Sequence, residues 1–97
     1  MSLGFAFGSA DAAEAFAEWA RKRRHPGGPL LTVWVHRDEP GEYGTGLSPW
    51  PRHRVEVERP GVPMDGATER DDAAARRAEV RIIDAACGKF GGRWLGT

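Results

Sequence analysis

The sequence predicts an α+β fold in which one antiparallel sheet carries two helices on one face. Three short segments, residues 3–8, 30–36 and 53–59, alternate apolar residues with small or polar ones, and this period of two is typical of strands. Two longer segments, one after residue 11 and one after residue 68, repeat apolar residues with the helical period. At 97 residues, these elements form one domain, residues 1–97.

The first strand has one apolar face and one nearly bare face. Leu3, Phe5 and Phe7 alternate with two glycines and an alanine in the segment LGFAFG. A strand face without side chains allows another backbone to approach closely. We therefore expect a helix of this chain or another subunit to lie against it.

The first helix is predicted to begin at Asp11, which forms a capping-box pattern with Glu14. It ends before Pro26 and Pro29, because proline cannot continue a helix. Its apolar stripe comprises Ala12, Phe16, Trp19 and Ala20.

Two further strands follow. LLTVWVH, residues 30–36, places Leu31, Val33 and Val35 on one face and Trp34 on the other, while HRVEVER, residues 53–59, has one apolar and one polar face. The loop between them, residues 37–52, contains Tyr43 and Trp50. Loops of this length are often functional.

The second helix is predicted to begin at Thr68 and to run to about Lys89, where two glycines end it. Cys87 and Phe90 are expected to pack inward, and residues 93–97 form either a short final strand or a tail. The apolar stripe comprises Ala75, Ala78, Ile82, Ile83, Ala86 and Phe90.

The order β-α-β-β-α, with an optional last β, is the split βαβ arrangement of ferredoxin-like folds. In such a sandwich two helices cover one face of the antiparallel sheet. The opposite face is open or covered by a partner, and a second copy of the chain would give a homodimer through it.

Charge and composition exclude several classes of function. Positive and negative side chains are equal in number, 14 each, so no overall field favours nucleic acid or a membrane surface. No apolar run approaches the ~20 residues that span a bilayer, and the single cysteine, Cys87, agrees with a reducing compartment. We therefore expect a cytoplasmic protein.

The run RKRRH, residues 21–25, leaves a nucleic-acid binder open as an alternative, through Arg21 to Arg24. Positive residues also favour a helix C-terminus, where they oppose the helix dipole. No aromatic stacking platform accompanies the run, so we do not expect nucleic acid as a partner.

Candidate catalytic groups are sparse. His25, His36 and His53 lack metal-ligand spacing, and Cys87 lacks a CxxC partner. We therefore expect no catalytic residue, metal site or cofactor, and hence no enzyme. One alternative remains, a small dimeric α+β barrel enzyme or ligand-binding protein, in which His36 and His53 face each other across the hairpin.

Trp34, Tyr43, Trp50 and Trp94 are too many amphipathic aromatics for one small core. Clusters of this kind are found at interaction surfaces. They are also found at the ends of a core, and the sequence leaves both interpretations open for Trp94.

The segments AEAFAEWA and FGGRWLGT resemble the regulator of ribonuclease activity B family. In FGGRWLGT, Gly91 and Gly92 match the glycines before the family signature, Trp94 matches its tyrosine and Gly96 its glycine. The signature's aspartate and final tryptophan have no counterpart at Leu95 and Thr97.

The resemblance implies a ferredoxin-like domain without chemistry of its own that binds and inhibits the endoribonuclease RNase E or a related RNA-processing enzyme. The expected partner-binding residues are Trp94, Arg93, Gly91, Gly92, Gly96, Trp50 and Tyr43.

Overall fold

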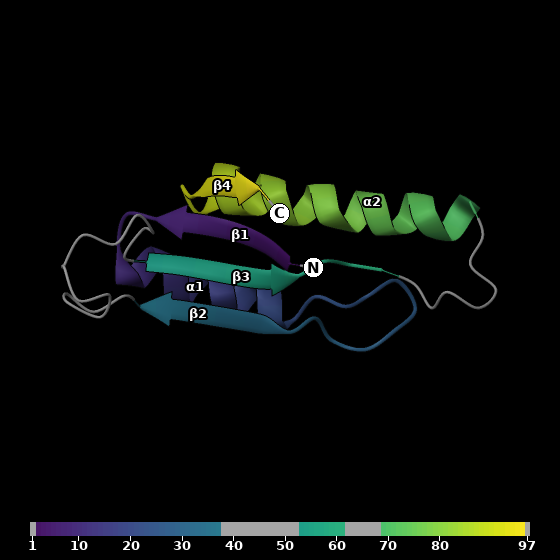
Figure 1. Ribbon diagram of the computed structural model, residues 1–97, viewed down its shortest axis with the longest axis horizontal. Helices are drawn as coiled ribbons and strands as arrows, with labels where there is room; N and C mark the ends of the chain where they lie inside the picture. The colour runs from purple at the N-terminus through teal and green to yellow at the C-terminus, as the bar shows by residue number, and fades with distance from the viewer. Residues whose placement is uncertain (1, 38–52, 62–68, 97) are drawn as a thin grey trace.

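The structure, a computed structural model, describes residues 2–37, 53–61 and 69–96, which form an α+β fold (Figure 1). The expectations for Tyr43, Trp50 and the Thr68 cap lie outside these residues. The elements are β1 (Ser2–Phe7), α1 (Ala10–Arg21), β2 (Val33–Arg37), β3 (His53–Glu58), α2 (Glu69–Asp84), the π-helical turn η1 (Ala85–Lys89) and β4 (Arg93–Gly96).

The four strands form one sheet in the order β2-β3-β1-β4, and every neighbouring pair is antiparallel. Strand β3 therefore lies between β1 and β2, which α1 connects, and β1 lies between β3 and β4, which α2 and η1 connect. Of the two alternatives for the last residues, the strand is confirmed.

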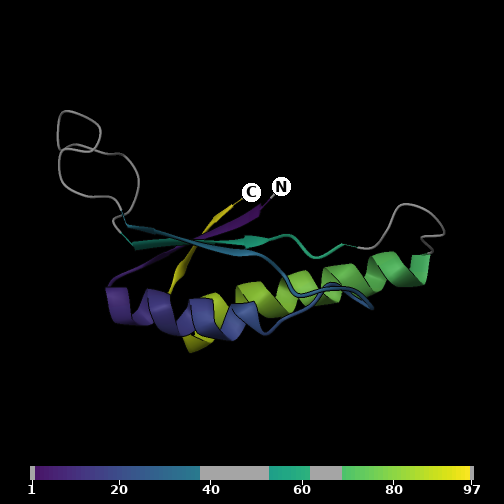
Figure 2. The ribbon, with the colours of Figure 1, turned by 90° about the horizontal axis from the view of Figure 1, so that it is seen from below.

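Both helices lie on the same face of the sheet (Figure 2). The other face, which we call the open face, is covered by neither helix. The N-terminal half of α2 extends past the end of the sheet (Figure 1). Ala75 and Ala78, predicted as part of the buried stripe of this helix, consequently remain partly exposed.

The core centres on Phe16 of α1, which is fully buried. Its ring packs edge-on against the rings of Phe5 and Phe90, with 5.2 Å and 5.7 Å between ring centroids. The centroid of the Phe7 ring lies 5.2 Å away. Val55 and Val57 of β3 are also fully buried, as their alternation predicts. Aromatic contacts therefore join α1 to β1 and to the segment after η1.

The start of α1 differs from the prediction. The N-cap is Ser9, whose Oγ accepts a hydrogen bond from the backbone N–H of Ala12 at 3.2 Å, whereas Asp11 lies inside the first turn. The buried residues of α1 are Ala13, Phe16, Ala17 and Ala20. The other two members of the predicted stripe, Ala12 and Trp19, pack against the core but remain partly exposed.

The end of the second helix widens into a π turn, in which the N–H of Phe90 donates to the carbonyl of Ala85 at 3.0 Å. Ala86 stays buried, but Cys87 is exposed, so the prediction that Cys87 packs inward is wrong. Cys87 directly follows the buried Ala86, and successive side chains of a helix point about 100° apart, so Cys87 lies off the buried stripe. Phe90 does pack against the core, as predicted.

Candidate functional site

The register of the sheet determines which side chains lie on the open face. Residues directly opposite each other in a sheet share a face, and Leu3, Phe5, Val55 and Val57 face the helices. The open face therefore carries Ser2, Gly4 and Ala6 of β1, Trp34 and His36 of β2, Arg54, Glu56 and Glu58 of β3, and Arg93 of β4.

The centre of the open face is built from small residues. Gly4 of β1 lies between Glu56 of β3 and Gly96 of β4, and Ala6 is the next residue of β1 on this face. Because two adjacent strands present glycine here, a partner can approach the backbone closely. The bare strand face expected from the sequence is thus the face away from both helices.

Trp34 stands at the β2 end of this glycine row, directly opposite Glu56. Its side chain is 43% exposed. With Ser2, His36, Glu56 and Glu58 it lines a shallow hollow of about 410 Å³. A large aromatic beside a shallow hollow is typical of a protein contact surface.

Glu56 organises the polar groups around Trp34. Its Oε2 accepts a hydrogen bond from Ser2 Oγ at 3.1 Å. Its Oε1 lies 3.6 Å from His36 Nε2 and 3.7 Å from Arg54 Nε. These contacts join three strands and hold the rim of the hollow in one arrangement. The sequence indicated only a polar face for β3, because the contacts depend on strand pairing.

Arg93 and Trp94 of β4 lie on opposite faces of the sheet. Arg93 is opposite Ala6 and so belongs to the open face, whereas Trp94 is opposite Phe5 on the helix side. Trp94 is nevertheless 44% exposed, because β4 is an edge strand. Trp94 therefore does not close the core, and the two residues expected to act on one surface meet only at the β4 edge.

Gly91 and Gly92 have structural roles at the end of η1. Gly91 has a φ of +68°, a left-handed conformation that favours glycine. The N–H of Gly92 donates to the carbonyl of Ala86 at 2.7 Å, and a Cβ on Gly92 would lie 2.5 Å from Phe7 Cε1. Backbone geometry and close packing account for both glycines without any contact to a partner.

His25 lies at one end of the sheet, and both of its ring nitrogens are engaged. Nδ1 accepts a hydrogen bond from the N–H of Gly61 at 3.0 Å, and Nε2 lies 3.0 Å from Glu58 Oε1. Because a backbone N–H can only donate, Nδ1 carries no proton, and Nε2–H donates to the carboxylate. The arrangement ties the loop after α1 to the end of β3 and leaves no ring nitrogen for catalysis.

The Glu58 carboxylate has a lowered pKa. The hydrogen bond from the backbone N–H of Thr32, 3.1 Å from Oε1, is the main cause, and the bond from His25 is the next. Both favour the ionised form.

We therefore expect Glu58→Gln to destabilise the fold at neutral pH and not at acidic pH. A carboxylate with a lowered pKa stabilises the fold above its ordinary value of 4.5, and this contribution is lost as the pH falls through the folded-state pKa. The side chain is 38% exposed, so we expect less than about 1 kcal/mol.

Urea denaturation at pH 7 and at pH 3 measures this difference. Glu18→Gln, at an exposed position of α1, is the control, which we expect within about 0.5 kcal/mol of wild type at pH 7. A Glu58→Gln effect of equal size at both pH values would contradict the assignment.

His36 and His53 do not form the histidine pair considered as an alternative. His36 is opposite Arg54, and His53 is opposite Arg37. The two histidines therefore lie one step apart in register and on opposite faces of the sheet. The prediction that they face each other is wrong, because a shift of one residue in the register of β2 against β3 moves a side chain to the opposite face of the sheet.

Within residues 2–37, 53–61 and 69–96, no group of three or more His, Cys, Asp or Glu side chains is arranged to hold a metal ion. In the same ranges no helix is long and apolar enough to cross a membrane. Comparisons of the chain with protein-family models, curated proteins and solved structures find no match.

Proposed function

We propose that this chain is a non-catalytic, cytoplasmic domain of the ferredoxin-like class that binds another protein through the open face and the adjoining β4 edge. The order of elements and the strand order β2-β3-β1-β4 support the fold assignment. The exposed Trp34 beside the glycine row supports the binding function.

The surroundings of Trp34 are the observation that carries the proposal. A tryptophan at 43% exposure on a strand, next to a shallow hollow and separated from two glycines only by Glu56, leaves apolar surface in contact with water. Covering this surface with a partner removes that cost. Arg93 at the other edge of the same face can add a bidentate contact to a partner carboxylate.

The surroundings of the histidines support a non-catalytic function. Both nitrogens of the His25 ring are engaged by main-chain and carboxylate groups. His36 and His53 are separated by the sheet. Cys87 is exposed on η1, and His36 is the one histidine among the open-face residues named above.

The resemblance of AEAFAEWA and FGGRWLGT to the regulator of ribonuclease activity B family supports an RNase E-type ribonuclease as the partner. Binding would obstruct a surface of that enzyme without any covalent step. In this proposal Trp34 and Arg93 contact the partner directly, and Trp94 contacts it where the edge of β4 is exposed.

Isothermal titration calorimetry of the full chain with RNase E from the same organism tests the proposal. We expect Trp34→Ala to weaken the complex about tenfold, equivalent to about 1.4 kcal/mol, since a central aromatic is removed. Val80→Ala is the matched control. Val80 is 55% exposed on α2, on the other side of the molecule, and its loss should leave the dissociation constant unchanged.

Equal weakening by both variants would contradict the open face as the contact surface. Absence of any complex with RNase E would contradict the partner. If the wild-type chain forms dimers and the Trp34→Ala substitution dissociates them, a second copy of the chain covers the face instead.

A further inference from the structure

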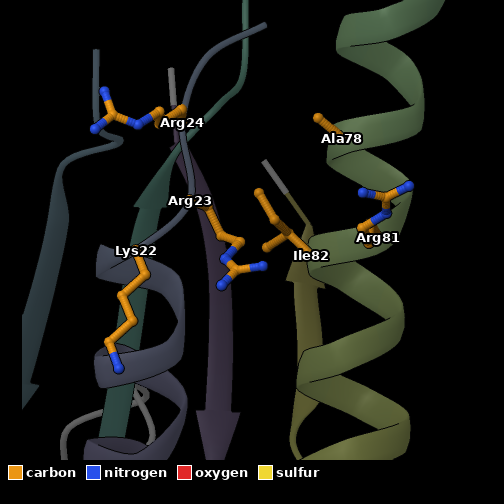
Figure 3. A pocket seen from close by; sticks show the side chains of 6 residues that line it. All are labelled: Lys22, Arg23, Arg24, Ala78, Arg81 and Ile82. Atoms are coloured by element: carbon orange, nitrogen blue, oxygen red, sulfur yellow. The ribbon is translucent and has the colours of Figure 1, made fainter.

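A second feature, on the helix side of the molecule, is a hollow of about 320 Å³ between the end of α1 and the helix α2 (Figure 3). No described carboxylate lines it. We call it the cationic hollow. Its lining residues are Lys22, Arg23, Arg24, Ala78, Arg81 and Ile82.

The backbone that carries the first three cations is fixed by hydrogen bonds. The N–H of Arg23 donates to the carbonyl of Ala20 at 3.0 Å, and the carbonyl of Arg23 accepts from the N–H of Leu31 at 2.8 Å. Arg24 forms an isolated antiparallel bridge with Leu30. The main chain thus fixes the segment that carries these residues, and they do not lie on a frayed helix end.

Arg23 is oriented by an aromatic ring. Its guanidinium carbon lies 4.6 Å from the centre of the Trp19 ring, and its Nε is buried with no hydrogen-bond partner among the described residues. Figure 3 shows this side chain reaching from the end of α1 toward Ile82, while Lys22 and Arg24 extend away from it. A guanidinium stacked on one face keeps its N–H edge available to an anion.

The positive charge around the hollow is not neutralised within the described part of the chain. Elsewhere arginines find carboxylates, as Arg59 does with Glu79 at 3.5 Å. Lys22, Arg24 and Arg81 make no ion pair with any described residue. The dipole at the end of α1 is equivalent to only about half a negative charge, so four cations leave a large local excess.

We propose that the cationic hollow binds the phosphodiester backbone of a single-stranded nucleic acid. The guanidinium groups suit phosphate oxygens, which they bind bidentately. The spread of the positive groups in Figure 3 fits successive charges along a chain better than one small anion. The hollow offers only Ala78 and Ile82 as apolar lining, which provides no anchor for the side chains of an acidic peptide.

This inference goes beyond the proposed protein-binding function, because α1 and α2 lie on the side of the sheet away from the open face (Figure 2), and the hollow is lined by residues of α2 and of the segment at the end of α1. It differs from the expectation from the sequence that nucleic acid is not a partner. That expectation used the net charge, which is zero, and the lack of an aromatic stacking platform beside residues 21–25. It could not include Arg81, which lines the same hollow as Arg23 and Arg24.

Fluorescence anisotropy of a labelled single-stranded RNA of about 12 nucleotides, titrated with the full chain, tests the proposal. We expect Arg81→Glu to weaken binding roughly tenfold and to reduce the slope of log K against log salt by about 0.7 per lost contact. Arg76→Glu is the matched control. It makes the same charge change at an exposed position of the same helix but does not line the hollow.

A single-stranded DNA of equal length should bind similarly, since the contacts are to the backbone. Equal dissociation constants for Arg81→Glu and Arg76→Glu would overturn the proposal, as would the absence of binding at about 50 mM salt. Displacement of the RNA by inorganic phosphate at matched ionic strength would assign the hollow to free phosphate. Equally tight binding of polyglutamate would assign it to a carboxylate-bearing partner.

Discussion

Replacing Phe16 by alanine is expected to lower the free energy of unfolding by about 3–5 kcal/mol. The side chain is fully buried, and its ring contacts Phe5, Phe7, Trp19 and Phe90. Removing it leaves a cavity bounded by rigid rings, which cannot close completely. Because domains of this size are stabilised by only about 5–15 kcal/mol, the variant should unfold at a much lower urea concentration.

Equilibrium urea denaturation followed by circular dichroism measures this effect. Trp34→Ala provides the comparison, because it also removes an aromatic ring, but from a position that is 43% exposed. We expect that variant to remain within about 1 kcal/mol of wild type. A Phe16→Ala protein as stable as Trp34→Ala would show that α1 does not pack on the sheet as described.

Gly92→Ala is expected to cost about 1–3 kcal/mol, although it adds a single methyl group. The new Cβ would lie 2.5 Å from Cε1 and 2.9 Å from Cζ of Phe7. The Phe7 side chain is itself buried in the core, so the ring cannot move aside without displacing its neighbours. The same substitution at Gly88, where nothing lies within 4 Å of the new atom, should be neutral or stabilising.

Thermal denaturation of the two alanine variants side by side separates steric overlap from backbone effects. A lower melting temperature for Gly92→Ala only is the expected result. If both variants melt together, the close approach of β1 to the turn after η1 is incorrect. A lower melting temperature for Gly92→Ala would also show that Gly92, which matches a glycine before the family signature, is required for packing.

The strands were the most predictable part of the fold. Alternation in LGFAF and HRVEVE places Phe5 and Val55 on the buried face, and the structure confirms both. The helix start was less predictable, because Ser9 and Asp11 are both competent N-caps, and only the path of the backbone selects Ser9. The π turn that ends the second helix has no local signal in the sequence.

The surfaces were only partly predictable, since they depend on residues distant in the sequence. The sequence placed Trp34 on the face opposite the core, but the contact between Glu56 and Ser2 follows from the pairing of β1 with β3. Arg81 joins Arg23 only through the packing of α2. Arg93 and Trp94 were assigned to one surface because the sequence does not show how this four-residue segment pairs with β1. That pairing decides which of its side chains lie on which face.

The central claim, that a protein partner covers the open face, is tested most directly by hydroxyl-radical footprinting of the chain alone and in its complex with RNase E. Trp34 is the reporter on the open face, and Val80 is the reporter on α2. We predict that complex formation slows the oxidation of Trp34 severalfold and leaves that of Val80 unchanged. A complex in which Trp34 is oxidised as fast as in the free chain would contradict the account.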